Sequence, residues 1–476
     1  MARAAVAPAI GAPQVQIIAP APLGATAREA LRVRGIDARL DDAPDDHSGD
    51  VIAWALSSIP TAAAAVELAK TCARAAAAGR PVCILAPFPE AARSHKPSRA
   101  QIERVAALAY LRAYGAAIGH DVDAWLESIV LLVRYGAPRG PHAAVIAPSG
   151  SWLEAQALSI AAEMEAANVR PPVIGPRTEG ETTDVVLYDP ALGQPPSSLP
   201  GLHVPVASRA ELATDPTMLY GARAALAAIT ILGRASERIA VGLGPAPKTA
   251  SAELAIDRER LDRQLDKLLS NIGRVGDHET KVLLAAYGVP ITRQAVATTP
   301  SAAVKLARKA GYPVEIKPWG HDQPTEPAGC PVEKGVASDA FVRAAFTSIL
   351  AAANRTDREG AVIVRETPPP GREIGVTLLE LPALGWTVVL DAPGAGQLAA
   401  PAPLRLLDAQ QLAAQIISSR AGDAEPDRVG LANLLRRASH LVVDLAGRIS
   451  RVELPRVIVG GRGSRTLVVD AALELG

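Results

Sequence analysis

The sequence predicts an α/β protein in which two parallel-sheet domains precede a third domain of a different kind. Over the first half of the chain, short apolar runs alternate with longer stretches of helical periodicity. That alternation is typical of parallel strands joined by helices. The length of 476 residues also exceeds what one compact core usually holds, which favours about three domains.

Changes in composition predict where these domains begin and end. A proline-containing segment after the second apolar region is interpreted as a linker, because its prolines break any helix. We expect a disordered lead-in (1–13), a first parallel-sheet domain (14–138), a second parallel-sheet domain (139–245), a linker (246–256) and a C-terminal domain (257–476).

Composition excludes several classes of function. Lys plus Arg and Asp plus Glu number 49 each, so no global field attracts nucleic acid or an acidic membrane. The longest apolar segments fall short of the roughly 20 residues that span a bilayer, and the first residues are too weakly apolar for a signal peptide. Cys72, Cys83 and Cys330 form neither a CxxC pair nor a disulfide framework. We therefore expect a cytoplasmic protein without nucleic-acid or membrane partners.

The first domain shows three strand-like runs separated by helical patterns. The expected strands are Val15–Ile18, Val51–Leu56 and Pro81–Leu85, and the expected helices are Ala27–Arg34, Thr61–Ala78, Gln101–Ala116 and Asp123–Tyr135. Right-handed crossovers between such strands give a parallel sheet. We interpret this region as a small flavodoxin-like unit.

The second domain opens with a strand, a tight turn and a helix. An anion at such a turn would meet backbone N–H groups and the positive end of the helix. Ser149 and Gly150 in this turn are therefore candidate phosphate-binding residues, and a simple turn between strand and helix is the alternative. The expected elements are strand His142–Ala147, helix Trp152–Ala167, strand Thr183–Tyr188 and helical structure over Ala210–Leu232.

The C-terminal domain begins with a charged helix and continues with a regular alternation of helix and strand. Gly288 and Gly311 are placed where helices end. Lys317 follows a tight turn on a short strand, where a fixed ammonium could meet phosphate oxygens. An ordinary surface lysine is the alternative. The expected elements are helix Asp257–Leu269, helix Glu279–Tyr287, a strand through Ile291, helix Ser301–Ala310 and strand Val314–Lys317.

Two motifs in this stretch resemble a known family. The pattern E-x-K-x-L-L-x-x-Y-G-V-P starts at Glu279, and G-Y-P-V-x-x-K ends at Lys317. Together they resemble the start of the ATP-grasp domain of NDP-forming acyl-CoA synthetases, the group of ADP-forming acetate–CoA ligase and succinyl-CoA synthetase. The resemblance implies two flavodoxin-like domains of the CoA-ligase type, an ATP or ADP site with Mg²⁺, and contact between Lys317 and the nucleotide phosphates.

The resemblance also implies a catalytic histidine. In the family, the histidine of a Ser-His-Thr-Gly motif carries the phosphoryl group between the nucleotide site and the acyl-CoA site. The corresponding residues here are Ser94-His95-Lys96-Pro97. A neutral imidazole is nucleophilic near pH 7, which suits His95 to this relay, but Pro97 removes a backbone donor and stiffens the loop. A plain surface histidine is the alternative.

The nucleotide and metal residues of the family are only partly retained. Glu366 follows a strand whose end meets adenine in the family, and Glu373 matches a family glutamate. Asp470 matches a metal-binding aspartate. Leu454 stands where the family has an asparagine, and leucine cannot coordinate Mg²⁺. Glu453 could replace the asparagine only if its strand were bulged.

Two hypotheses follow for the function. In the first, the chain is a divergent, non-catalytic binding or assembly subunit; in the second, it is an ATP-dependent acid–thiol ligase, or part of one, that uses a phosphohistidine relay. Only about a dozen residues precede Val15, too few for the family's coenzyme A module. We therefore expect coenzyme A to bind only with a partner subunit that supplies this module, in a homo- or hetero-oligomer. Leu454 and the loss of most of the glycines that the family carries after Lys317 favour the first hypothesis, and the retained Lys317 and His95 favour the second.

Overall fold

The structure is a computed structural model, and it describes most of the chain. The described residues are 14–44, 50–88, 98–166, 171–174, 183–193, 195, 199–207, 215, 217–268, 273–320, 330–353, 360–392, 396–417, 425–461 and 464–476. They fall into two compact units. The first comprises the described residues up to 88 and from Ser98 to Gly244, and the second runs from Pro245 to Gly476.

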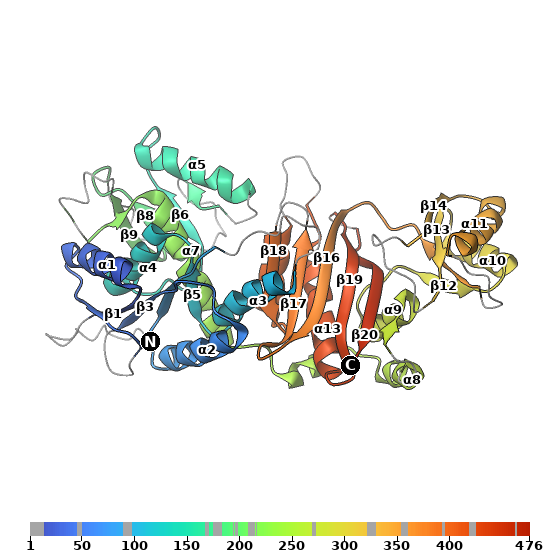
Figure 1. Ribbon diagram of the computed structural model, residues 1–476. Helices are drawn as coiled ribbons and strands as arrows, with labels where there is room; N and C mark the ends of the chain where they lie inside the picture. The colour runs from blue at the N-terminus through green and yellow to red at the C-terminus, as the bar shows by residue number, and fades with distance from the viewer. Residues whose placement is uncertain are drawn as a thin grey trace. The chain divides into compact units, whose positions relative to one another are not determined.

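The first unit contains a five-stranded parallel sheet in the order β2-β1-β3-β4-β5 (Figure 1). This order is that of the flavodoxin-like fold. The strands are β1 (Val15–Ile18), β2 (Ala38–Leu40), β3 (Val51–Ala55), β4 (Val82–Leu85) and β5 (Ala116–Gly119), and the helices are α1 (Ala21–Val33), α2 (Ala62–Ala77), α3 (Arg99–Ala113) and α4 (Val122–Tyr135). The fold class expected for this region is confirmed.

Two of these strands differ from the expected elements. The predicted helix Gln101–Ala116 is too long, because α3 ends at Ala113 and β5 begins at Ala116. Gly115 lies between them at φ +88°, a left-handed conformation that glycine adopts without strain. The short strand β2 gave no clear sequence signal, because only three residues take part in it.

The first unit also contains a second parallel sheet, in the order β10-β9-β8-β6-β7. If β6 is numbered as the first strand of this sheet, its strand order, read from the opposite edge, is the same as that of the first sheet. The strands are β6 (Ala143–Ile146), β7 (Val173–Ile174), β8 (Val185–Tyr188), β9 (Leu202–Ala207) and β10 (Leu219–Tyr220), and the helices are α5 (Trp152–Ala166) and α7 (Ala222–Val241). The expected helix over Ala210–Leu232 is corrected in part, because Leu219 and Tyr220 form β10 and α7 extends to Val241.

One hydrophobic core serves both parallel sheets. Val15 and Ile129 from the first sheet and its helices share a buried cluster with Val145 and Ala157 from the second. A polar link joins them as well, because Glu127 of α4 accepts hydrogen bonds from Arg34 and from the Tyr220 N–H at 3.0 Å. The two sheets therefore form one packed body, and a domain boundary at residues 138 and 139 stays a prediction.

The second unit is built mainly on a six-stranded antiparallel sheet, β11-β20-β19-β16-β17-β18. Helices α12 and α13 pack against it in a large apolar cluster. The strands are β11 (Arg274–Val275), β16 (Arg372–Leu381), β17 (Gly385–Ala392), β18 (Gly396–Pro401), β19 (Ile449–Val459) and β20 (Leu467–Leu475). The helices are η1 (Lys248–Glu253), α8 (Arg258–Leu268), α9 (Asp277–Ala286), α12 (Leu406–Ile416) and α13 (Arg428–Asp444).

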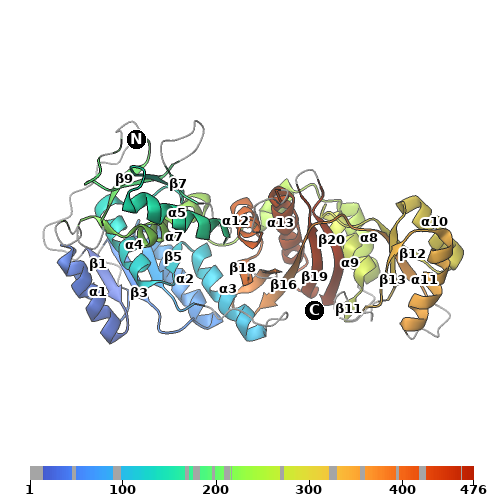
Figure 2. The same ribbon diagram turned by 90° about the horizontal axis from the view of Figure 1, so that it is seen from above.

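A smaller sheet in the same unit has the order β12-β15-β13-β14 and is antiparallel. Helices α10 and α11 lie beside this sheet (Figure 2) and bury its apolar side chains. The elements are β12 (Gln294–Ala297), α10 (Pro300–Ala310), β13 (Val314–Pro318), β14 (Glu333–Val336), α11 (Asp339–Ala352) and β15 (Val362–Glu366). Thr299 and Ser338 cap α10 and α11 by accepting backbone N–H bonds, as expected for helix starts.

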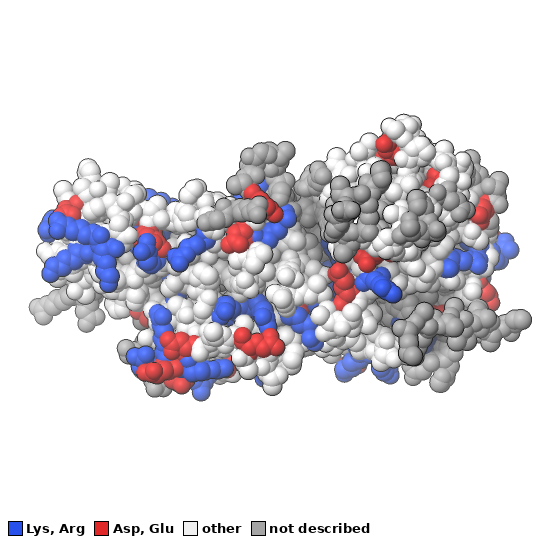
Figure 3. Space-filling view, turned by 180° about the vertical axis from the view of Figure 1, so that it is seen from behind, with Lys and Arg blue, Asp and Glu red and all other residues white. Residues whose placement is uncertain are grey.

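The surface carries both signs of charge. On the face shown in Figure 3, acidic side chains lie beside basic ones in most places. Arg308 and Asp339, for example, form an ion pair through Nε at 3.1 Å. In the described part of the chain, no helix is both long and apolar enough to cross a bilayer.

Candidate functional site

Alternation along two strands brings charged side chains to one face of the small sheet. Val314 and Ile316 of β13 pack into the apolar core with α10 and α11. Glu315 and Lys317 therefore point to the opposite face. On β15, Arg365 is the direct cross-strand partner of Glu315, and its guanidinium donates to Glu315 Oε2 from Nε at 2.8 Å and lies 2.6 Å from it through Nη2.

Strand β20 and the first turn of α9 supply the remaining charged groups. Asp470 lies in the middle of β20, and Asp277 and Lys281 stand four residues apart on α9, so both face the same side of the helix. Asp277 Oδ1 accepts a hydrogen bond of 2.8 Å from the N–H of Ala471, which fixes the start of α9 against β20.

Together these side chains form a network that we call the buried ion cluster, which consists of Asp277, Lys281, Glu315, Lys317, Arg365 and Asp470. Lys317 Nζ pairs with Asp470 Oδ1 and lies 3.1 Å from Asp277 Oδ2. Arg365 Nη1 donates to the same Asp470 oxygen at 3.0 Å. Three cations face three carboxylates, and no side chain of the cluster is more than 7% exposed.

The opposite charges in the buried ion cluster keep Asp470 and Lys317 ionised despite their burial. Burial alone would raise the pKa of Asp470, but Lys317 and Arg365 hold it well below its usual range. Burial alone would lower the pKa of Lys317, but Asp277 and Asp470 raise it. Both groups are therefore charged near neutral pH, and Lys317 has its ammonium directed at two carboxylates of its own chain.

Lys281 is held differently. Burial lowers its pKa to about 8, and the attraction of Asp277 only partly opposes this. Its Nζ donates to Thr292 Oγ1 at 3.0 Å and to Gln294 Oε1 at 2.7 Å, and lies 3.2 Å from Asp277 Oδ2. Neutral oxygens thus satisfy two of the three ammonium donors.

The strand that should carry a second metal ligand is bulged. The β19–β20 register shifts between Glu453 and Arg456, and Arg456 is the residue opposite Asp470. Leu454 is fully buried in the apolar core. Glu453 lies opposite Ala472 in the ladder, and its carboxylate pairs with Arg451 at 2.6 Å. A cation, Arg456, therefore lies opposite the retained aspartate.

These side chains do not fit a Mg²⁺ ion. Asp470 Oδ2 is buried and accepts no hydrogen bond from a described residue, so one carboxylate oxygen remains for a ligand. However, Lys317 and Arg365 contact the other oxygen of the same carboxylate. Within the described ranges, no three His, Cys, Asp or Glu side chains converge as a metal site. The assignment of Asp470 as a metal ligand stays a prediction of the sequence.

The two other predicted nucleotide residues have partners of their own. Glu366 Oε2 accepts from Arg293 Nε at 2.6 Å, and Glu366 Oε1 accepts from the Arg293 N–H at 2.9 Å. Glu373 Oε1 accepts from Arg456 Nε at 2.9 Å, and its side chain is 56% exposed. Their roles at a nucleotide stay predictions. Arg456 connects Glu373 with the buried ion cluster, because the same guanidinium that pairs with Glu373 also has its Nη1 3.9 Å from Glu315 Oε2.

The turn before α5 carries its own acid. Gly150 has φ +80° and exposes its N–H, which donates to Glu154 Oε2 at 2.5 Å. Ser151 Oγ accepts the N–H of Glu154 at 3.2 Å, so Ser151 and Glu154 together satisfy the start of the helix. Ser149 is exposed. A carboxylate of the chain thus takes the donor that a phosphate would use at this turn.

His95 lies outside the described residues, as do Ser94, Lys96 and Pro97. Sequence reasoning did not single out Asp277, Lys281, Glu315 or Arg365. The signal was present, because Asp277 and Lys281 have helical i,i+4 spacing and Glu315 interrupts an apolar strand. Nothing in the sequence alone says which of these charges meet.

The fold and the sequence together define the class of this second unit. Residues 268–475 match the family model described as "ATP-grasp domain". The large antiparallel sheet and the smaller sheet with its two helices thus form an ATP-grasp domain, as the resemblance predicted.

The relatives of the chain are ADP-forming acyl-CoA ligases. It is 26% identical over 213 residues to the beta subunit of ADP-forming acetate–CoA ligase II of Pyrococcus furiosus, which covers 42% of this chain and 90% of that protein. It is 25% identical over 213 residues to ADP-forming 4-hydroxybutyrate–CoA ligase of Nitrosopumilus maritimus, with 42% of this chain and 30% of that protein covered. The chain thus spans most of one relative and about a third of the other.

A solved structure gives a similar comparison. It is a dinucleotide-forming acetyl-coenzyme A synthetase 1 of Ca. Korarchaeum cryptofilum, in complex with coenzyme A, Ca-AMPCP and HgCl⁺. The identity is 24%, the TM-score is 0.40, and the match covers 45% of this chain and 99% of that one.

Proposed function

We propose that the chain is a divergent relative of the NDP-forming acyl-CoA synthetases that acts, when alone, as a non-catalytic binding or assembly subunit. The observation that carries this proposal is the pairing of Lys317 with Asp470 inside the buried ion cluster. The resemblance to the family implies that Lys317 contacts the nucleotide phosphates and that Asp470 binds the metal. Here each is a partner of the other.

The energetic cost of opening the cluster supports weak nucleotide binding. Breaking a buried ion pair costs about 3–5 kcal/mol when one partner is left uncompensated. At about 1.4 kcal/mol per tenfold change in affinity, that cost weakens the binding of a ligand by roughly two to four orders of magnitude. A nucleotide that recruits Lys317 must first separate it from Asp277 and Asp470.

The same geometry supports little dependence on Mg²⁺. Arg456 is opposite Asp470 in the ladder, and Leu454 is in the apolar core. A divalent cation near Asp470 would face Lys317 and Arg365 at contact distance. We therefore propose that ATP or ADP, where it binds, does so without a strict requirement for the metal.

A partner subunit completes the proposal. The relative from Pyrococcus furiosus is named a beta subunit, which supports a role of this chain within a larger assembly. We propose that coenzyme A is bound by a module on another chain, that the assembly is a homo- or hetero-oligomer, and that it works in the cytoplasm.

Calorimetric titration with ATP and ADP, each with Mg²⁺ and with EDTA, tests the nucleotide part of this proposal. We expect dissociation constants no tighter than about 1 mM, changed little by EDTA. Lys305→Met, on the exposed face of α10, is the matched control for Lys317→Met. Tight binding that disappears both in EDTA and in Lys317→Met, and survives in Lys305→Met, would contradict the proposal.

The second candidate is an active acid–thiol ligase, and the retention of Lys317 and Asp470 together with the identity of the relatives favours it. An active relay would leave an acid-labile, base-stable phosphoryl group after incubation with ATP labelled at the transferable phosphate. We expect no label on the chain. Stoichiometric label that is lost in His95→Asn would establish the ligase instead, because asparagine lacks the nucleophilic nitrogen.

A further inference from the structure

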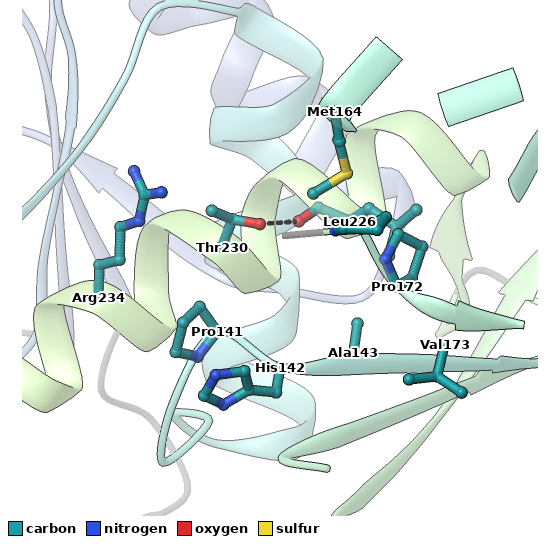
Figure 4. Close-up of a pocket in the computed structure, with 10 residues that line it drawn as sticks. Pro141, His142, Ala143, Met164, Pro172, Val173, Leu226, Thr230 and Arg234 are labelled. Atoms are coloured by element: carbon teal, nitrogen blue, oxygen red, sulfur yellow. Dashed lines mark hydrogen bonds between the residues drawn. The ribbon is translucent and has the colours of Figure 1, made fainter. Parts of the chain in front are cut away.

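A small pocket in the first unit lies between α5, α7 and the beginnings of β6 and β7 (Figure 4). Met164 of α5 and Leu226 of α7 give it apolar walls, His142 and Pro172 lie at the strand starts, and Arg234 lines it from further along α7. Its volume is about 60 Å³. At about 10–15 Å³ for each water-sized group, that volume holds about four to six such groups.

The wall formed by α7 changes from apolar to charged. Leu226, Thr230 and Arg234 follow one another at intervals of four residues, so they share one face of the helix (Figure 4). Thr230 Oγ1 donates to the Leu226 carbonyl at 2.9 Å, so its proton is already engaged. Arg234 is therefore the donor that α7 presents to a ligand here.

Arg234 has no hydrogen bond or ion pair to any described residue, although its guanidinium carries five N–H donors. The residue is half-buried. Burial lowers its pKa, and the attraction of Glu237, one turn away on α7, opposes this without a hydrogen bond between the two side chains. A guanidinium in this state is stabilised by an oxyanion.

A second arginine strengthens the positive field at this place. Arg112 of α3 is exposed, and repulsion from Arg234 is one of the causes that lower its pKa. The Arg112 Nη2 lies 3.3 Å from His120 Nε2, a neutral partner whose Nδ1 lies 2.9 Å from the Ala86 carbonyl.

Asp184, the carboxylate that contacts His142 of the pocket lining, has partners of its own. Asp184 Oδ2 lies 2.9 Å from His142 Nδ1 and accepts the His142 N–H at 3.1 Å. Both contacts are made with His142, and among the described residues Asp184 forms no ion pair with Arg234.

We propose that this pocket binds a small carboxylate with a short apolar chain. The carboxylate lies on Arg234, and the chain lies against Met164 and Leu226. The site is separate from the buried ion cluster, and the proposal does not depend on the function proposed above.

Ligand-observed NMR with butyrate on the full-length chain tests it. We expect saturable binding that weakens about tenfold or more in Arg234→Met, because a charge-assisted hydrogen bond is lost. Arg223→Met is the matched control, because Arg223 is on the same helix and pairs with Glu163 at the surface. Its binding should equal that of the wild type. Butyramide, which lacks the charge, should not bind.

Several results would overturn the proposal. Absence of saturable butyrate binding to the wild type would do so, as would equal weakening in both arginine variants. Binding of inorganic phosphate without binding of butyrate would overturn the carboxylate assignment, and decanoate binding more tightly than butyrate would contradict the size of the pocket. If Arg234→Met does not fold, Arg234→Lys replaces it: the charge is kept and the planar fork is lost, so intermediate binding is expected, and unchanged binding would count against the proposal.

Discussion

Replacing Asp470 with asparagine removes one charge from the buried ion cluster while keeping nearly the same shape. Asp470 Oδ1 receives Lys317 and Arg365, and both cations are at most 3% exposed. Asp277 and Glu315 would remain as the only carboxylates of the cluster, against the cations Lys281, Lys317 and Arg365. An uncompensated buried charge costs about 3–5 kcal/mol. We expect the free energy of unfolding of the second unit to fall by that amount in Asp470→Asn.

The assay must follow the second unit alone, because a chain of two units need not unfold in one step. Hydrogen exchange of peptides from β13 and β20 in increasing urea reports the opening of the strands that carry Lys317 and Asp470. Asp339→Asn is the control, because Asp339 pairs with Arg308 at the surface, where their side chains are 36% and 66% exposed. Such a pair contributes at most about 1 kcal/mol.

A double variant separates loss of charge from loss of shape. Lys317→Met combined with Asp470→Asn leaves two cations and two carboxylates, so it should be less destabilised than the sum of the single variants. Coupling between contacting residues of this kind is typically about 0.5–3 kcal/mol. The reasoning fails if Asp470→Asn costs no more than Asp339→Asn, or if the two single effects simply add.

Two further predictions concern pH and backbone packing. The pKa of Lys281 is about 8 in the folded chain, against an ordinary value of 10.5. Between these two pH values the unfolded state binds more protons, so the free energy of unfolding rises with pH. Thermal unfolding of the wild type relative to Lys281→Met should show a rise of roughly 3 kcal/mol over that pH range, and a difference that does not change with pH would contradict the prediction. A Cβ at Gly233 would lie 2.3 Å from the Gly140 carbonyl carbon, so Gly233→Ala should destabilise the first unit by about 1–3 kcal/mol in thermal unfolding, and an unchanged melting temperature would contradict the tight packing there.

Local periodicity predicts the bounds of a helix or strand correctly where the element is long or its apolar pattern is strong. The helix α2 and the strand β13 lie within a residue or so of their expected bounds. It failed at β5, whose sequence Ala-Ala-Ile-Gly continues the alanine-rich pattern of α3. That segment is a strand because it pairs in parallel with β4, and such a tertiary preference outweighs local propensity.

The candidate site was predictable only in part for the same reason. Lys317 and Asp470 were singled out as separate ligands, yet they are 153 residues apart and their pairing depends on how two sheets meet. Glu315 pairs with Arg365 because of the β13–β15 register. The bulge in β19 sets Arg456 opposite Asp470, and a bulge of one residue leaves no reliable mark in the sequence.

The shared core of the two parallel sheets has a practical consequence for dissecting the chain. Residues of α4 and of the second sheet line one apolar cluster, and Glu127 receives both Arg34 and the Tyr220 N–H. A fragment cut between α4 and β6 would expose that apolar surface on both pieces and leave the Glu127 carboxylate without one of its donors. The natural place to divide the chain is after Gly244, where the first compact unit ends.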